Sequence, residues 1–219
     1  MAATRLDCDK VVETALGLLN AEGLEGLTLR RLAKELQVQA PALYWHFANK
    51  QALLDAMATR MLRQMLERGM GQEVPGSDWR DWIATACRGT RRALLAYRDG
   101  ARVFSGTHLT DDSHAGALER YLGAFVEQGF RVEDAVNAWF TAYTFTIGFV
   151  IEEQAVQQLP GRRDPRYDTD ERQARLGGEF PLVGEAGREM FDHYDARFET
   201  GLRILVAGIE RTLAPDGAR

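Results

Sequence analysis

Apolar residues recur at three- and four-residue intervals along most of the chain, which is the spacing of an amphipathic helix. Within Thr28–Lys50 this pattern predicts two short helices joined by a tight turn. Thr28 is a good N-cap for the first helix. The apolar positions that follow it are Leu29, Leu32, Ala33 and Leu36. Pro41 then fits the first turn of a second helix, predicted over Gln39–Phe47, because its missing N–H costs nothing there. A two-turn helix in this position is typical of a helix-turn-helix that reads the DNA major groove.

The same periodicity predicts helices on both sides of this segment. A helix that begins at Asp7 or Asp9 should end at Gly23. The later helices are expected over residues 50–68, from Asp78 to a break at Asp99–Gly100, and over 102–104, 116–128, 133–154 and 188–213. Residues 1–6 should be disordered, and Gly69–Gly76 should be a loop.

The segment 157–187 is charged and rich in Pro and Gly, which predicts a long mobile loop with one helical turn around Asp170–Arg175. No strand pattern and no internal repeat occurs. We therefore predict an all-α fold, with a three-helix DNA-binding domain over residues 1–50, a linking helix over 50–68 and a second helical domain over 69–219.

Composition supports a globular protein in the cytoplasm. The chain has 219 residues, of which 45% are hydrophobic and 27% charged. No apolar run approaches the roughly 20 residues of a membrane span, and the first residues lack the apolar core of a secretory signal. The net charge is −5, but residues 1–70 carry +1 and the remainder −6. A near-neutral reading domain can still bind phosphates if its cations cluster on one face. The cations expected there are Arg30, Arg31, Lys34 and Lys50.

Catalytic and metal-binding patterns are missing from the sequence. It contains no Gly-x-Ser-x-Gly, HExxH, CxxC or phosphate-cradling glycine loop, so we expect neither an enzyme nor a cofactor. The carboxylate pairs Asp111–Asp112 and Glu152–Glu153 are adjacent, and neighbouring helix residues do not face each other. Two cysteines, Cys8 and Cys87, are too few for a disulfide framework or a zinc site. A reactive sensor thiol stays open as an alternative.

The second reading helix should expose part of its aromatic cluster, because so short a helix cannot bury Tyr44, Trp45 and His46 together. Gln39 and Arg30 are able to form bidentate pairs with adenine and guanine edges, whereas Ala40 and Ala42 offer only methyl contacts. The predicted DNA-contacting residues are Thr28, Arg30, Gln39, Ala40, Pro41, Ala42, Tyr44, Trp45, His46 and Lys50. One short reader contacts few bases, so a homodimer on a palindromic site is expected.

The segment TLRRLAKELQVQAPALYWHFANK (Thr28–Lys50), and within it LYWHF-xx-K, resembles the DNA-binding head of the TetR family of transcriptional repressors. Four more segments resemble the tetracycline-repressor branch of that family: Ala52–Met57, Arg91–Phe104, Glu127–Phe130 and Phe145–Gln154. The resemblance implies that the second domain binds a small-molecule inducer. It also implies that the helices at about 133–154 and 188–213 form a four-helix dimer bundle.

The same resemblance implies an altered ligand site. Tetracycline repressors hold a magnesium–drug chelate with a histidine whose place is taken here by Phe104, whereas a water-linked glutamate is retained as Glu152. His108 and His114 are poor candidates for a replacement metal ligand, so no metal is predicted. The residues expected to line the ligand site are Trp82, Ala86, Thr90, Phe104, Thr107, His108, Tyr121, Trp139, Tyr143 and Glu152. A mostly apolar site with few polar groups suits an aromatic or polycyclic organic molecule.

Two other interpretations of the sequence stay open. One is a regulator controlled by a protein partner or lacking any small-molecule ligand. The other is a purely architectural DNA-binding protein, which would not need so large an aromatic second domain.

Overall fold

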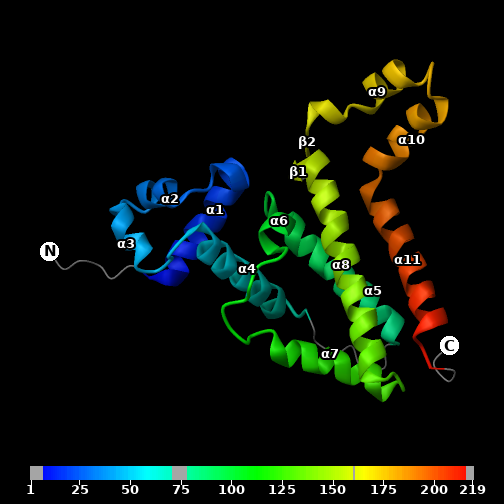
Figure 1. Ribbon diagram of the computed structural model, residues 1–219, viewed down its shortest axis with the longest axis horizontal. Helices are drawn as coiled ribbons and strands as arrows, with labels where there is room; N and C mark the ends of the chain where they lie inside the picture. The colour runs from blue at the N-terminus through cyan, green and yellow to red at the C-terminus, as the bar shows by residue number, and fades with distance from the viewer. Residues whose placement is uncertain (1–6, 71–77, 160, 216–219) are drawn as a thin grey trace. The chain divides into compact units, whose positions relative to one another are not determined.

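The computed structural model describes residues 7–70, 78–159 and 161–215 and is helical over most of that length (Figure 1). Its helices are α1 Cys8–Gly26, α2 Leu29–Glu35, α3 Ala40–Tyr44, α4 Lys50–Glu67, α5 Trp79–Leu95, α6 Gly100–Phe104, α7 Ala115–Glu127, α8 Val132–Val156, α9 Thr169–Leu176, α10 Pro181–Phe191 and α11 Tyr194–Thr212. The predicted all-helical fold class is confirmed. The predictions for residues 1–6 and for most of the loop 69–76 lie outside the described residues.

The chain forms two compact units. The first combines the residues up to 72 with residues 92–120, and the second combines 73–91 with 121–219. This division by packing differs from the functional division at residues 50 and 69, which stays a prediction.

In the first unit, α1 packs on α4 and carries the apolar face that the sequence predicted. Val11, Ala15 and Leu19 are fully buried on it. The helical conformation breaks at Gly23, where φ is 77°, as expected for the predicted end of the helix.

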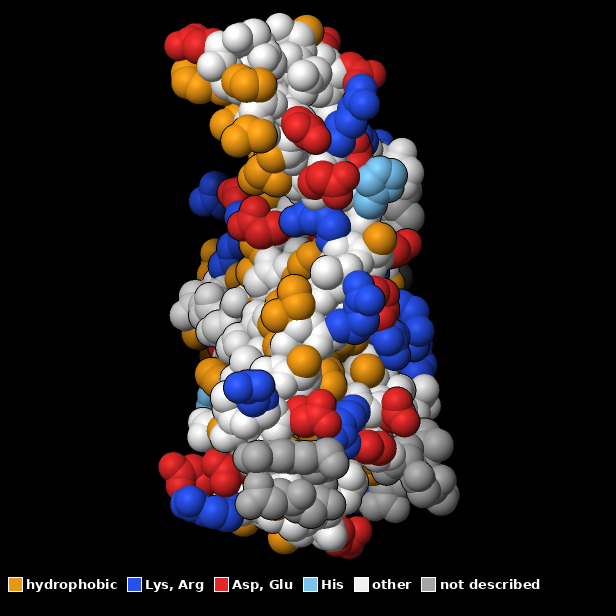
Figure 2. All heavy atoms as spheres, turned by 90° about the vertical axis from the view of Figure 1, so that its right-hand side faces the viewer, with side chains coloured by type: hydrophobic (Ala, Val, Ile, Leu, Met, Phe, Trp, Pro, Cys, Tyr) orange, Lys and Arg blue, Asp and Glu red, His pale blue; other side chains and the backbone are white. Residues whose placement is uncertain are grey.

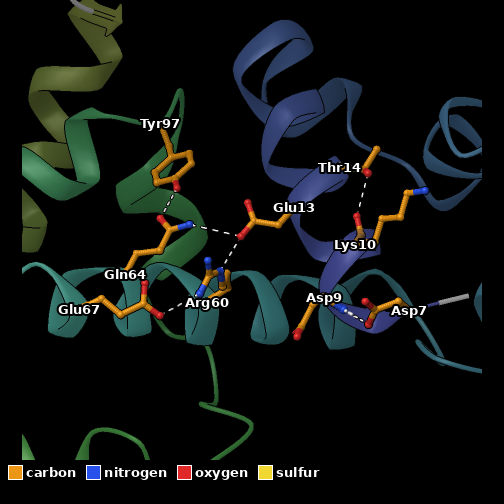
Figure 3. Close-up of polar contacts among 9 residues, drawn as sticks. All are labelled: Asp7, Asp9, Lys10, Glu13, Thr14, Arg60, Gln64, Glu67 and Tyr97. Carbon is orange, nitrogen blue, oxygen red and sulfur yellow. Dashed lines mark hydrogen bonds and ion pairs between the residues drawn. The ribbon is translucent and has the colours of Figure 1, made fainter.

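Polar contacts join α1, α4 and the turn that follows α5 within this unit (Figure 3). The Arg60 guanidinium donates to Glu13 at 2.5 Å and to Glu67 at 3.1 Å. Gln64 donates to Glu13 at 3.4 Å and accepts a hydrogen bond from the Tyr97 hydroxyl at 2.5 Å. These contacts hold α4 in a defined position against α1.

The second unit has an aromatic core built by α5, α7, α8 and α11. Trp79 lies edge-on to Phe130 with ring centroids 5.3 Å apart, and Phe130 lies edge-on to Phe125 at 5.1 Å. On the other side of this core, Phe145 of α8 stacks on Phe198 of α11 at 5.5 Å. Burial of these rings removes apolar surface from water and so stabilises the unit.

The predicted mobile loop over 157–187 is wrong. Two short antiparallel strands, β1 Gln157–Leu159 and β2 Arg162–Arg163, follow α8 directly, with Gln157 opposite Arg163. The expectation of no strand is therefore wrong as well. A 3-10 turn at Pro165–Tyr167 leads into α9 and α10.

Local capping explains why this polar segment is ordered. The Asp168 carboxylate accepts hydrogen bonds from the backbone N–H groups of Asp170 and Glu171, which caps α9. Pro181 begins α10. The rings of Tyr167 and Phe191 pack together with centroids 5.4 Å apart and so join the two ends of the segment. Composition indicated a loop because it does not register such position-specific caps.

The single helix predicted over 188–213 is also wrong, since α10 ends at Phe191 and α11 begins at Tyr194. His193 has φ 56°, a left-handed conformation that no helix continues through. The Asp192 carboxylate accepts from Arg163 at 2.5 Å and from the Thr169 hydroxyl at 3.2 Å. The break thus ties the hairpin and α9 to the start of α11.

Candidate DNA interface and ligand-binding residues

The helix-turn-helix consists of α2, a tight turn and α3. Thr28 caps α2 as predicted, because its Oγ1 accepts a hydrogen bond from Arg31 N at 3.1 Å. The turn requires a left-handed residue, and Gln37 provides it with φ 56°. Leu43 (0% exposed) and Phe47 (5%) then anchor the reading element in the first core. The turn geometry therefore fixes how α3 leaves α2.

The reading helix is shorter than predicted. α3 spans only Ala40–Tyr44, and Trp45 and His46 lie in the turn after it rather than on a helix reaching Phe47. The reason is that the backbone N–H groups of His46 and Phe47 both bond to the Leu43 carbonyl, which tightens the last turn and ends the helix.

The aromatic cluster at the end of α3 faces outward. Tyr44 is 51% exposed and Trp45 90% exposed, and His46 is also exposed. Surface exposure on this scale is unusual for a Trp in a monomeric protein. These side chains are therefore available for phosphate, sugar or thymine-methyl contacts.

Two residues with bidentate hydrogen-bonding ability lie on this surface. Gln39 precedes α3, makes no side-chain capping bond and is exposed, so its amide is available for a base edge. Arg30 is exposed and makes no ion pair with any described residue. Pro41 is exposed, and Ala40 and Ala42 are half-buried, which limits both alanines to short contacts.

The four cations expected to cluster have different environments. Lys34 is exposed like Arg30. The Arg31 guanidinium is held by Glu22 at 2.7 Å and by Glu35 at 2.8 Å, which neutralises its charge. Lys50 Nζ donates to the Leu24 carbonyl oxygen at 2.8 Å. Its ammonium group keeps further donors for a phosphate, but it also fixes the start of α4 to the end of α1.

The predicted ligand residues are divided between the two units. In the second unit, the ring centroids of Trp82 and Tyr121 are 5.7 Å apart, and Trp139 stacks on Tyr143 with ring centroids 5.4 Å apart. Ala86 and Thr90 are half-buried on α5. Burial raises the pKa of Tyr121 well above its ordinary value and raises that of Tyr143 as well. Both phenols therefore stay neutral hydrogen-bonding groups at physiological pH.

Three of the predicted ligand residues belong to the first unit. Phe104 is buried at the end of α6, and the Thr107 hydroxyl donates to its carbonyl oxygen at 2.9 Å. His108 is exposed, and its backbone N–H donates to Asp55 at 3.2 Å. The assembly of these residues with those of the second unit into one site stays a prediction.

Glu152 and its neighbour Glu153 have opposite environments. Glu152 is exposed, whereas Glu153 is 4% exposed and forms a bidentate pair with Arg91 through contacts of 2.8 and 2.6 Å. The sequence pattern indicated no pairing between Glu153 and Arg91. No local pattern distinguishes the two adjacent glutamates, because burial of Glu153 depends on how α5 packs against α8.

Among the described residues, no group of three or more His, Cys, Asp or Glu side chains is arranged to hold a metal ion. No helix in the described ranges is long and apolar enough to span a membrane.

A tight turn, a short reading helix with an exposed aromatic end and a separate helical unit define a helix-turn-helix transcription regulator. Comparison with family models makes the class specific. Residues 11–57 match the model for bacterial regulatory proteins of the tetR family, and residues 73–213 match the tetracyclin repressor-like C-terminal domain. The chain belongs to the TetR family of transcriptional repressors.

Individual relatives agree with this assignment. The tetracycline repressor protein class A from transposon 1721 of Escherichia coli is 41% identical over 95% of this chain and 92% of that protein. The crystal structure of a possible TetR family regulator from Streptomyces coelicolor A3(2) has 39% identity and a TM-score of 0.80, and the match covers 94% of this chain and 99% of that one. The TetR family protein ActR of Streptomyces coelicolor, solved in complex with actinorhodin, has 29% identity and a TM-score of 0.75, with 94% and 97% of the two chains covered.

Proposed function

We propose that this protein is a homodimeric repressor that binds a palindromic operator and is released from it by a small aromatic or polycyclic molecule. Residues 1–50 would read the operator, and residues 69–219 would bind the inducer and form the dimer. The observation that carries the DNA-binding role is the exposure of Tyr44 and Trp45 beside the free side chains of Gln39 and Arg30.

Dimerisation is supported by apolar surface on α8 and α11 that the second unit leaves uncovered. On α8, Val132 (61% exposed), Val136 (41%) and Phe140 (55%) follow each other at four-residue spacing and so share one face. Ile204 of α11 is 69% exposed, and the face that carries α11 shows hydrophobic side chains between its charged ones (Figure 2). Exposed apolar surface of this kind is typical of protein interfaces.

The dimer has a direct test. Phe140→Glu should shift the protein from dimer to monomer in sedimentation velocity and abolish specific operator binding, because two readers at a spacing of about 34 Å contact successive major grooves. Val126→Glu is the matched control, since Val126 is also exposed but lies on α7. A Phe140→Glu protein that remained dimeric would contradict the proposed interface.

The inducer class follows from the residues at the predicted ligand site. Phe104 provides an apolar ring at the position where tetracycline repressors hold magnesium through a histidine. The paired rings Trp82–Tyr121 and Trp139–Tyr143 favour a flat, unsaturated molecule. The crystal structure of ActR in complex with actinorhodin supports a small-molecule ligand for a protein of this fold.

We expect tetracycline to release operator DNA poorly and EDTA to leave release by the natural inducer unchanged. A fluorescence-anisotropy titration of labelled operator, with and without magnesium, measures both effects. Release by micromolar tetracycline that depends on magnesium would contradict the proposed ligand class. Phe104→His should increase tetracycline-dependent release if the side chain at this position determines the chelating ability of the site.

A change in the melting temperature on addition of small molecules separates this proposal from control by a protein partner. A ligand that binds the folded dimer at 100 times its dissociation constant should stabilise it by about 2.7 kcal/mol. If none of the tested compounds both releases the operator and raises the melting temperature, control by a protein partner becomes the better interpretation.

A further inference from the structure

Cys8 and His46 lie far apart in the sequence but meet in the first unit. Cys8 is the first residue of α1, and His46 follows the reading helix α3. The distance between Cys8 Sγ and His46 Nδ1 is 3.1 Å, and both side chains are exposed. A thiol at this distance can donate its proton to an unprotonated imidazole nitrogen. The pair therefore has the arrangement of a nucleophile and its base.

A cavity of about 380 Å³ opens beside this pair. Its apolar wall consists of Val12, Phe47, Ala52 and Ala56. Arg60 and Arg63 also line it, but their charges are paired, Arg60 with Glu13 and Glu67 and Arg63 with Asp111. Asp9 and Asp55 add negative charge. The volume lies within the range of small-molecule sites. All the residues that line the cavity belong to the first unit, so the site is complete within the DNA-reading part of the chain.

The second cysteine of the chain has the opposite environment. Cys87 is 4% exposed in the second core, and its Sγ lies 3.7 Å from the Ala142 carbonyl oxygen. Burial raises the pKa of its thiol, which keeps it protonated and unreactive. Cys8 is therefore the accessible nucleophile of the two cysteines.

We propose that Cys8 is a covalent modification site for α,β-unsaturated carbonyl compounds, with His46 as the proton acceptor. Cys8 Sγ attacks the β-carbon and forms the S–C bond, while the π electrons of the C=C bond move toward the carbonyl group. His46 Nδ1 accepts the thiol proton and returns it to the α-carbon. The reaction is an addition, so it needs no leaving group, oxidant or reductant, and the cavity holds the rest of the molecule.

The modification would act on DNA binding because of its position. His46 stands at the end of the exposed aromatic cluster, and an adduct on Cys8 would fill the space between α1, α4 and the residues after α3. This consequence rests on the proposed operator binding, whereas the covalent reaction does not. The expected loss of operator affinity is about tenfold, within the usual range of coupling between two sites.

The reaction is tested on the full-length dimer with N-ethylmaleimide and N-phenylmaleimide, with glutathione as the free-thiol reference. Intact-mass measurement should show one adduct on the wild type and on Cys87→Ser, and none on Cys8→Ser while it is folded. His46→Gln should react about tenfold or more slowly, which is the lower range of a general-base contribution. Relative to glutathione, the phenyl compound should react faster than the ethyl compound, because the cavity binds its ring.

Each part of the inference can fail separately. Equal rates for the wild type and His46→Gln, or a Cys8 thiol no faster than glutathione, would overturn the site. An adduct at Cys8 that leaves operator affinity unchanged would overturn its effect on DNA binding. Cys8→Ser treated with the same reagent controls for reaction elsewhere, and it should keep full operator affinity. If the untreated wild type bound no operator, the proposed function would fail while the adduct measurements remained valid.

Discussion

Replacement of Glu153 by Gln should destabilise the second unit strongly, because Glu153 and Arg91 form a buried ion pair. Their side chains are 6% and 12% exposed, and two contacts of 2.8 and 2.6 Å join them in a bidentate geometry. Arg91 also lies 5.0 Å above the Phe198 ring. Removing one partner of such a pair leaves the other charge buried without compensation, which costs about 3–5 kcal/mol.

The surroundings of Arg91 place this variant at the lower end of that range. Arg91 keeps a 2.7 Å contact with Asp195, a residue that is 93% exposed and therefore a weakly held partner. We expect Glu153→Gln to lose about 3 kcal/mol and Arg91→Met, which strands a carboxylate, to lose about 4–5 kcal/mol. For a chain of this length, 3 kcal/mol corresponds to a fall of about 6–12 °C in melting temperature.

Urea unfolding at fixed protein concentration measures these values, since the stability of a dimer depends on its concentration. Glu152→Gln is the matched control: it removes the neighbouring charge from an exposed position and should change stability by less than about 0.5 kcal/mol. The double variant Arg91→Met/Glu153→Gln should be more stable than the sum of the single losses predicts. Equal unfolding midpoints for Glu153→Gln and Glu152→Gln would refute the reasoning.

Three further predictions follow from the reading surface and from Cys87. Tyr44→Ala should weaken binding to all DNA sequences, whereas Gln39→Ala should relax the base preference at one position of the operator. If Gln39→Ala selected the same motif as the wild type from random operators, Gln39 would be excluded as a base-contacting residue. Lys50→Ala should lower the slope of log binding constant against log salt concentration by about one unit. It should also lower the melting temperature, because Lys50 donates to the Leu24 carbonyl oxygen. An unchanged slope would exclude Lys50 from the phosphate contacts. Burial raises the pKa of Cys87, so the unfolded chain releases this proton at a lower pH than the folded one. The stability it contributes is complete below about pH 8.5 and falls above it, by at most about 1.4 kcal/mol per pH unit. Urea unfolding at pH 7.5 and 9.5 should therefore show that Cys87→Ala loses less unfolding free energy between these two pH values than the wild type does. Equal losses in the two proteins would contradict the prediction.

Local signals in the sequence were sufficient to predict the helix-turn-helix. The Thr28 cap, the Pro41 position and the apolar spacing between them act over a few residues, so they predicted α2, the turn and the start of α3. The end of α3 was misplaced because it depends on how the His46 and Phe47 N–H groups share the Leu43 carbonyl. Helix ends of this kind depend on packing as well as on pattern.

The segment after α8 shows the limit of composition as a predictor. Charge and proline indicated a loop, yet the same residues supply the Asp168 cap, the Pro181 start and the Asp192 contacts that order it. These contacts join residues that are up to 29 positions apart, so periodicity within one helix cannot reveal them.

The sequence alone determined the helical class, the helix-turn-helix and the family, because each depends on short-range spacing or on a continuous motif. Only the tertiary structure decided which of two adjacent glutamates is buried, that Arg31 and Lys50 among the four cations are held by neighbouring groups, and that Cys8 meets His46. Adjacent residues on a helix point in directions about 100° apart, so a neighbouring helix buries one and leaves the other in water. That choice depends on packing between segments distant in the chain, and such packing leaves no local signature in the sequence.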